Sequence, residues 1–595
     1  MKKRWNNLCY LLTYSWQKGR ALCFASAGKA AFYALTSLVD VVGLGLVVDA
    51  LANGRPRQEV FRLILFYLLF NLVVALAAQA LTLMENMAMR KASDITQRDY
   101  MNDGLRIDYH YAQDCSILDL KKKSMRANPA WFVVSVGQLL KCILQFVGVA
   151  YLFAVLSPLF LSVLLLTSIL SIFCILRERN LDFAYRNASA EDERVMEYLY
   201  RTMTEAKYAK EIRINGAKDL LMQKYTDRYK SHFGRTARLE KQRSGLRAWS
   251  LVISGIQSVA MYLYFSYQVI TAQIGVGEYT VLLGATTLLA GVLFEFFNLT
   301  VNSMAKTLDY TDLFRQYQDY VVKNSKIYAS RLLPPREIDP ADLQISFEDV
   351  SFTYPGTKCP VLEHISFTIT RGEKLGIVGL NGSGKTTLIK LLCRLYDPTE
   401  GKVTLNGVDV RQIPHAEYTR LIGIVLQDFC LFAYSVRENL VFGVQADENR
   451  LRECIEKSGL TEKIASLQNG TNTSIYKTLD DNGVEFSGGE GQKVALARAI
   501  YKDAKVLILD EPTAALDPLA ELDLFSRLAN IADGRTTLFI SHRLSSTRFC
   551  DRILVLADGK IAEIGSHDEL IKKNGVYADL FRTQAKNYDI SEVVT

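Results

Sequence analysis

The sequence has 595 residues, which is more than one hydrophobic core usually serves, so at least two domains are expected. Hydrophobic residues make up 49% of the chain and charged residues 22%, a mixture that indicates membrane helices joined to a water-soluble unit. The net charge of +7 does not indicate nucleic acid as a partner, because the basic residues gather in two long loops between apolar segments. The cysteines form no CxxC pair and the histidines no HxxxH pattern, which argues against a zinc site.

Six apolar segments are each long enough to cross a bilayer. They cover residues 22–50, 60–84, 131–156, 158–176, 246–271 and 280–304. The loops after the second and fourth segments are long and rich in Lys and Arg, whereas the other loops are short. The positive-inside rule therefore predicts a multi-pass protein of the cell membrane, with the bacterial inner (plasma) membrane expected and with the N-terminus and the C-terminal domain in the cytoplasm.

Ionisable side chains inside the predicted spans are costly to bury in lipid, so they are candidates for contact with a transported molecule. Asp40 and Glu295 lie deepest and are predicted to line a substrate cavity. Lys141 also falls inside a span, whereas Lys29 and Asp49 lie near predicted ends, where a charged group can reach the interface.

A stretch with three prolines ends the membrane part, and short β-rich runs that alternate with helical stretches follow it. The prediction is an all-α membrane domain over 1–325, a linker over 326–343, an α/β domain over 344–585 and a tail over 586–595.

A phosphate-binding loop is predicted where the pattern G-x-x-x-x-G-K-[ST] lies between an apolar strand and a helical run. Its glycines let backbone N–H groups converge on the phosphates of ATP, while Lys385 reaches the β and γ phosphates and Thr386 ligates Mg²⁺. The predicted ATP contacts from this loop are Gly379, Asn381, Gly382, Ser383, Gly384, Lys385, Thr386 and Thr387.

The apolar run that ends in Asp510 is typical of a buried central strand, and it delivers that carboxylate to the magnesium ion. Glu511 follows at once and is predicted to act as the general base or to orient the attacking water. A structural ion pair is the alternative role for Glu511.

A second anion-binding helix start is formed by Ser487, Gly488, Gly489 and Glu490. One ATP does not need two such sites from one chain, because the first loop already encloses its phosphates. We therefore expect this helix start to cap a nucleotide that is held by a second chain.

These residues, in this order, resemble the ABC transporter family, and the resemblance covers essentially the whole chain. It implies that Tyr354 stacks on adenine, that Gln427 senses magnesium and the membrane domain, that Asp517 belongs to the D-loop, and that His542 contacts the γ-phosphate. The alternatives are a packing role for Tyr354, a surface role for Gln427 and a structural role for His542. Short segments near 111–118 and 209–216 are expected to contact the ATPase crosswise.

The chain departs from the family pattern at three positions of the signature segment. Phe486 stands where Leu is usual, Glu490 where Gln is usual, and Lys493 where Arg is usual. An acid remains compatible with a helix N-terminus, because the helix dipole favours it. The preceding residues 480–485 resemble a variant of some bacterial exporters of modified peptides.

Six spans followed by one ATPase resemble an exporter-type half-transporter, which needs a second chain to complete two ATP sites. A homodimer is favoured, and a heterodimer stays open. The expected function is ATP-driven export of an amphipathic peptide, lipid or drug-like molecule, with membrane lipid as the surrounding partner. The alternatives are an importer with an exporter-type fold and an ATP-gated channel or regulator.

Overall fold

The computed structural model describes residues 2–156, 192–325, 343–512 except 444, 534–541 and 544–586, with isolated positions between these ranges. The chain forms two compact units. The first comprises Met1–Asp103 and Ser116–Asp319, and the second comprises Gly104–Cys115 and Tyr320–Thr595. The predicted linker 326–343 and tail 586–595 fall almost wholly outside the described residues.

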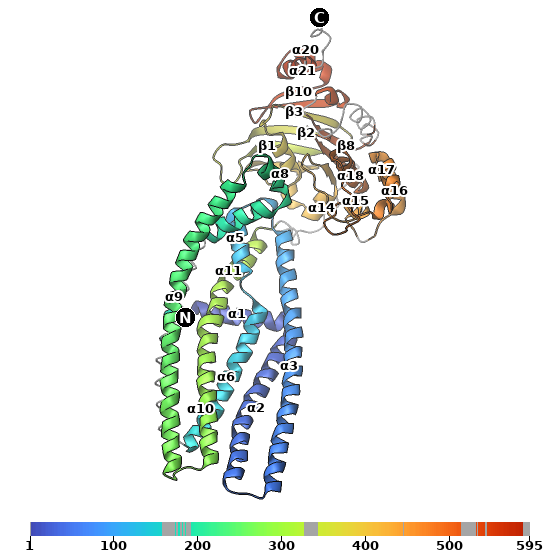
Figure 1. Ribbon diagram of the computed structural model, residues 1–595. Helices are drawn as coiled ribbons and strands as arrows, with labels where there is room; N and C mark the ends of the chain where they lie inside the picture. Colours follow the sequence, from blue (N-terminus) through green and yellow to red (C-terminus); the bar gives the residue numbers. More distant parts are fainter. Residues whose placement is uncertain are drawn as a thin grey trace. The chain divides into compact units, whose positions relative to one another are not determined.

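The first unit is helical (Figure 1). Its helices are α1 (Lys2–Lys18), α2 (Arg20–Ala52), α3 (Arg57–Arg106), α5 (Cys115–Ser124), α6 (Pro129–Leu156), α8 (Ala206–Ile214), α9 (Lys218–Ile270), α10 (Val276–Phe297), the π-helix η1 (Asn298–Met304) and α11 (Ala305–Lys323). Some of the end residues of α3, α5 and α11 fall in the second unit.

Four described stretches are long and apolar enough to cross a membrane, namely Arg20–Ala52, Arg57–Arg106, Ser116–Phe153 and Val276–Thr300. The predicted spans 22–50, 60–84 and 131–156 lie within α2, α3 and α6. The span 246–271 coincides with the last part of α9, which is not among these four stretches. The predicted span 280–304 is divided between α10 and η1. The span 158–176 lies outside the described residues except at isolated positions.

The short connections and the long loops lie at opposite ends of the membrane helices, as the loop pattern predicts. The α2–α3 turn and the α9–α10 turn lie at the same end of the helices (Figure 1). At the other end α3 and α9 continue far beyond the predicted spans, so the long basic loops are built as helical extensions.

The helix α1 was not predicted from the sequence, because its 17 residues are too few to cross a bilayer. Leu11 is fully buried, whereas Trp5, Leu12 and Trp16 are exposed. A helix with large exposed apolar side chains beside a membrane domain is typical of one that lies in the membrane interface.

Small residues let the membrane helices approach closely. A Cβ atom at Gly137 of α6 would lie 2.0 Å from the Ser26 hydroxyl of α2, and one at Gly45 of α2 would lie 2.2 Å from a Val281 methyl of α10. Contacts of this kind drive helix association in membranes, where lipid and side chains are equally apolar.

Two charged pairs tie membrane helices together. The Lys141 ammonium on α6 donates to both carboxylate oxygens of Glu295 on α10, at 2.8 and 2.7 Å. The Lys29 ammonium on α2 donates to Glu85 on α3 at 2.6 Å. Each of these four charges therefore has a partner of opposite sign, which reduces the free-energy cost of placing it inside a membrane.

The second unit contains two sheets. Strands β1 (Ile345–Phe352), β2 (Leu362–Ile369), β4 (Glu400–Leu405) and β5 (Val408–Asp409) form an antiparallel sheet. Strands β3 (Lys374–Gly379), β6 (Ile422–Val425), β7 (Val506–Asp510), β8 (Thr536–Ile540), β9 (Arg552–Ala557) and β10 (Lys560–Gly565) form the larger sheet in the order β10-β9-β3-β8-β7-β6. Its pairs are parallel except β9 with β10.

The larger sheet is buried on both faces, which is why its strands read as continuous apolar runs. Leu507 and Leu509 of β7 belong to the core on one face, and Val506 and Ile508 belong to the core on the other. Helix α18 (Gly488–Tyr501) packs in the first core, and α13 (Lys385–Leu392) packs in the second with the antiparallel sheet.

The remaining helices that the structure describes in this unit are short. They are α4 (Tyr109–Ala112), α14 (His415–Arg420), α15 (Val436–Val441), α16 (Glu448–Ser458), α17 (Thr461–Ser466), α20 (His567–Lys573) and α21 (Val576–Lys586). Within the described residues the 3-10 turns are η3 (Val410–Gln412), η4 (Gly470–Asn472) and η5 (Leu544–Phe549).

The pairing of Lys141 with Glu295 gives a stability prediction. Lys141→Met leaves the Glu295 carboxylate unpaired, so we expect the protein to lose about 2 kcal/mol and to unfold at a lower Tm in detergent. Replacing Glu295 with Met as well removes both charges and should restore most of the loss.

The control is Lys18→Met, which breaks the more exposed pair with Asp99 at 3.0 Å and should change Tm little. An unchanged Tm in Lys141→Met would contradict the stabilising role of the pair.

Candidate functional site

The site is built where the parallel strands of the larger sheet end. The phosphate loop follows β3, Asp510 closes β7, and Gln427 comes two residues after β6. Since β3 pairs with β8 and β8 with β7 in parallel, their carboxyl ends meet at one edge of the sheet. Ligands of open α/β sheets bind at such an edge.

The loop between β3 and α13 has the backbone that only glycine adopts readily. Gly382 has a φ of 82° and Gly384 a φ of 103°. A Cβ at Gly384 would lie 2.5 Å from Leu362 Cδ2, so the loop also packs too closely there for a side chain. Gly384 is the N-cap of α13, and the free N–H groups of its first turn face the loop.

Two buried polar side chains at this loop are suited to binding an anion. Lys385 is 6% exposed, and its ammonium donates to the carbonyl oxygens of Gly379 at 2.9 Å and Leu380 at 3.0 Å. Burial lowers the pKa of Lys385, opposed by the carboxylates at the end of β7. The Ser383 hydroxyl is buried and has no hydrogen-bond partner within the described part of the chain. A buried ammonium and an orphaned hydroxyl fit an anion bound in the loop.

The acidic end of β7 is buried. Asp510 is 4% exposed, and burial, together with the neighbouring Glu511, raises its pKa to about 6. The raised pKa means that Lys385 and Lys390 do not fully offset the burial of this carboxylate. A hard cation such as Mg²⁺ takes oxygen ligands of this type.

Glu511 is held in a left-handed backbone conformation with a φ of 49°. Its N–H donates to the Ile540 carbonyl at the end of β8 at 2.9 Å, and its carbonyl accepts from Gln492 Nε2 of α18 at 3.2 Å. Strain of this kind persists where the surroundings fix a residue, and it concentrates at functional positions. The role of Gln492 was not predicted, because it comes from a contact between residues 19 positions apart.

The structure brings Tyr354 to the phosphate-loop helix. Its hydroxyl lies 3.0 Å from the Thr387 hydroxyl, and the Lys390 ammonium lies 5.5 Å from its ring centroid. Phe352 and Tyr396 contact the ring edge to face. Tyr354 is thus a partly exposed ring beside the phosphate loop.

The signature segment begins α18 as the sequence indicates. Ser487 is the N-cap, and its hydroxyl accepts from the Glu490 N–H at 3.3 Å while Glu490 accepts from the Ser487 N–H at 2.8 Å. This capping box leaves Ser487 and Gly488 exposed at the helix start. Asn381, Thr386 and Gln427 are also exposed, and His542 and Asp517 lie outside the described residues.

A segment of the first long loop belongs to the second unit and packs on Tyr396 of that unit. The rings of Tyr109 and His110 lie 6.0 and 5.7 Å from the ring of Tyr396, which itself contacts Tyr354. The contact begins two residues before the predicted segment 111–118, and it is made within one chain. The other predicted segment, 209–216, overlaps α8, whose Ile214 is 81% exposed.

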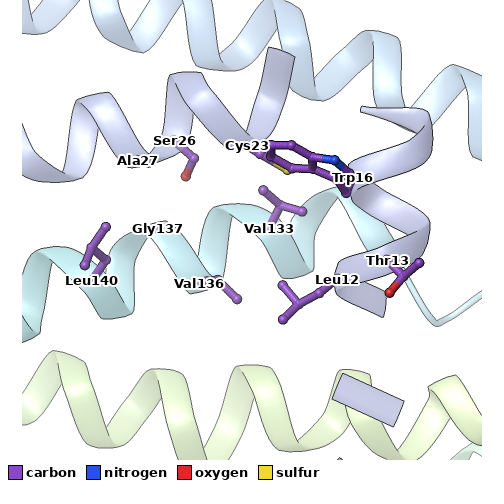
Figure 2. Close-up of a pocket in the computed structure, with 10 residues that line it drawn as sticks. All are labelled: Leu12, Thr13, Trp16, Cys23, Ser26, Ala27, Val133, Val136, Gly137 and Leu140. Atoms are coloured by element: carbon purple, nitrogen blue, oxygen red, sulfur yellow. The ribbon is translucent and has the colours of Figure 1, made fainter. Parts of the chain in front are cut away.

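The first unit contains an apolar cavity of about 440 Å³ between α1, α2 and α6 (Figure 2). Leu12, Trp16, Val136 and Leu140 supply carbon atoms to its wall. The Ser26 hydroxyl also lines it and is buried with no hydrogen-bond partner among the described residues.

The predicted cavity residues do not line this cavity. Asp40 accepts a hydrogen bond from Tyr67 of α3, and Glu295 is engaged by Lys141. The contact of Asp40 and Glu295 with a transported molecule stays a prediction.

Comparison with known proteins finds similarity in both halves. Residues 362–514 match the family described as ABC transporter. An ATP-dependent lipid A-core flippase of Burkholderia orbicola (strain AU 1054) is 42% identical over 249 residues, which cover 42% of this chain and 41% of the relative. A protein of the same name from Vibrio vulnificus (strain CMCP6) is 36% identical over 337 residues, covering 56% of this chain and 55% of the relative.

The chain therefore spans about half the length of these relatives. A solved bacterial Atm1-family ABC exporter with ATP bound has a TM-score of 0.75 and 22% sequence identity. The alignment covers 94% of this chain and 98% of that chain, so the two share the fold over nearly their whole length.

The packing at Gly384 yields a prediction for nucleotide binding. Gly384→Ala adds a methyl group against Leu362 at a position with positive φ, so the loop or the Leu362 side chain must shift and the backbone is strained. We expect the affinity for a fluorescent ATP analogue to fall about tenfold or more.

Gly534→Ala is the matched control, because Gly534 has a φ of 70° with nothing within 4 Å of an added Cβ. It should lower the free energy of unfolding by about 1 kcal/mol without weakening nucleotide binding. Wild-type affinity in Gly384→Ala would show that the loop geometry does not govern binding.

Proposed function

We propose that this protein, which has an ABC transporter ATPase domain and the fold of an ABC exporter, moves an amphipathic molecule across the membrane at the expense of ATP. The observation that carries the proposal is the pair of helix starts in one chain, at Gly384 and at Ser487, each suited to phosphate. Loop charge and helix length support a cytoplasmic ATPase domain.

In this proposal ATP lies at the carboxyl edge of the larger sheet. Tyr354 stacks on the adenine, and the loop from Gly379 to Thr387 encloses the phosphates, with the Lys385 ammonium turned from the loop carbonyls to the β and γ phosphates. Thr386, Gln427 and Asp510 are the residues that would hold Mg²⁺, which offsets negative charge on the phosphates when bound.

The proposed chemistry is hydrolysis of the γ-phosphate bond. A water molecule attacks the γ-phosphorus, the bond to the bridging oxygen of ADP breaks, and inorganic phosphate leaves. Glu511 orients this water and accepts its proton, and its fixed backbone limits the positions its carboxylate can take. His542 contacts the γ-phosphate from beyond the end of β8.

The ATP site is proposed to be completed by a second chain. Ser487, Gly488 and Gly489 of one copy face the γ-phosphate held by the other, with Asp517 near the same interface. All of these elements occur in this chain, so two identical copies can form two complete sites. The exposure of Ser487 and Gly488 agrees with a surface that is covered on assembly.

An amphipathic substrate is supported by the apolar cavity beside α1 and by the relatives named lipid A-core flippases. We further propose that α8 contacts the ATPase domain of the second copy through its exposed residues, including Ile214.

The assignment of Glu511 is tested by Glu511→Gln. This change keeps the size of the side chain but removes the basic oxygen, so ATP binding should persist while turnover falls at least about a hundredfold. Glu453→Gln, at an exposed pair with Lys457, is the control and should hydrolyse ATP normally.

Phosphate release and nucleotide binding are measured on the purified protein in lipid nanodiscs. Near-normal hydrolysis in Glu511→Gln would remove Glu511 from this role. Transport itself is tested in sealed vesicles with a fluorescent lipid. We expect the lipid to move across the membrane only with ATP, and we expect Glu511→Gln to abolish this movement. Movement without ATP would contradict the proposal.

A further inference from the structure

A lysine outside the predicted site joins two of the unusual signature residues. The Lys463 ammonium on α17 lies 2.9 Å from Glu490 Oε1 and 5.0 Å from the centroid of the Phe486 ring. Phe486 and Glu490 both depart from the family pattern, so one side chain connects two of the three departures.

Both oxygens of the Glu490 carboxylate are engaged. Oε1 receives Lys463, and Oε2 receives the Ser487 N–H at 2.8 Å. The side chains of Lys463 and Glu490 are 23% and 30% exposed, so water screens this pair only in part. Burial alone would raise the pKa of Glu490, but the hydrogen bonds from Lys463 and Ser487 outweigh it, and the pKa lies below its ordinary value. Glu490 is therefore ionised at neutral pH.

An ionised carboxylate in this place has a consequence for phosphate binding. It sits in the first turn of α18, beside the N–H groups that would bind the γ-phosphate of a second copy. A negative charge there repels phosphate, and at an effective dielectric of about 20 one unit charge several ångströms away lowers affinity by about tenfold or more. The Lys463 ammonium cancels that charge, and the face of the Phe486 ring favours a cation at its position.

We propose that Lys463 is a positioning residue of the composite ATP site, which neutralises Glu490 and holds its carboxylate against the helix start so that Ser487, Gly488 and Gly489 can receive phosphate. This inference rests on the proposed function. Lys463 acts through Glu490 and does not itself contact the nucleotide.

The test compares four variants with the wild-type protein by steady-state ATP hydrolysis in nanodiscs. Lys463→Met should raise the KM for ATP about tenfold with little change in kcat, because it uncovers the charge of Glu490. Adding Glu490→Gln to Lys463→Met should bring the KM back to that of Glu490→Gln alone, because no charge remains to be neutralised. Lys457→Met breaks the exposed pair with Glu453, 2.6 Å long, and is the control that should leave KM unchanged.

A purely structural role of Lys463 gives a different pattern, since loss of packing would lower Tm and Glu490→Gln would not rescue it. An unchanged KM in Lys463→Met, or a raised KM that persists in the double variant, would overturn the inference. If Lys463→Met does not fold, Glu490→Gln is compared with the double variant, and any difference in KM between them overturns it. A wild-type protein without ATP hydrolysis would overturn the proposed function itself.

Discussion

Parallel pairing of β3 with β8 and of β8 with β7 is the constraint on which the rest of the ATPase domain depends. It brings the phosphate loop, Asp510 and the backbone of Glu511 to one edge of the sheet, although they are far apart in the sequence. The cores on the two faces of the sheet fix that edge, because β7 contributes alternate side chains to both. Charged and strained groups such as Lys385 and Glu511 are held there by a framework that is otherwise apolar.

The helical unit is subject to a different physical constraint, because charged side chains lie within its apolar helices. Lys141 with Glu295 and Lys29 with Glu85 are paired between helices, and small residues such as Gly137 bring the backbones close. The π-helix η1 begins three residues after Glu295, and π-helical turns often mark positions where a helix is adapted for function. The two charged pairs are among the contacts that hold α6 against α10 and α2 against α3.

Local patterns in the sequence were sufficient for the phosphate loop, the strand that ends in Asp510, and the capped start of α18. Each of these depends on residues within a few positions, such as the glycine spacing before Lys385. Contacts between distant residues left no such pattern, which is why the partners of Glu295, Glu490 and Glu511 were found only in the structure. Strands β4, β5 and β10 show no clear local pattern either, because β5 has two residues and the other two are partly exposed and polar.

The central claim is that one chain supplies the phosphate loop and another supplies the helix start at Ser487. Two variants test it directly: Lys385→Ala disables the first element, and Ser487→Arg disables the second. Each variant alone should hydrolyse almost no ATP, but co-expressed chains form mixed dimers with one intact site. Random pairing predicts about a quarter of the wild-type ATPase activity. A mixture that stays as inactive as either variant alone would contradict the composite site.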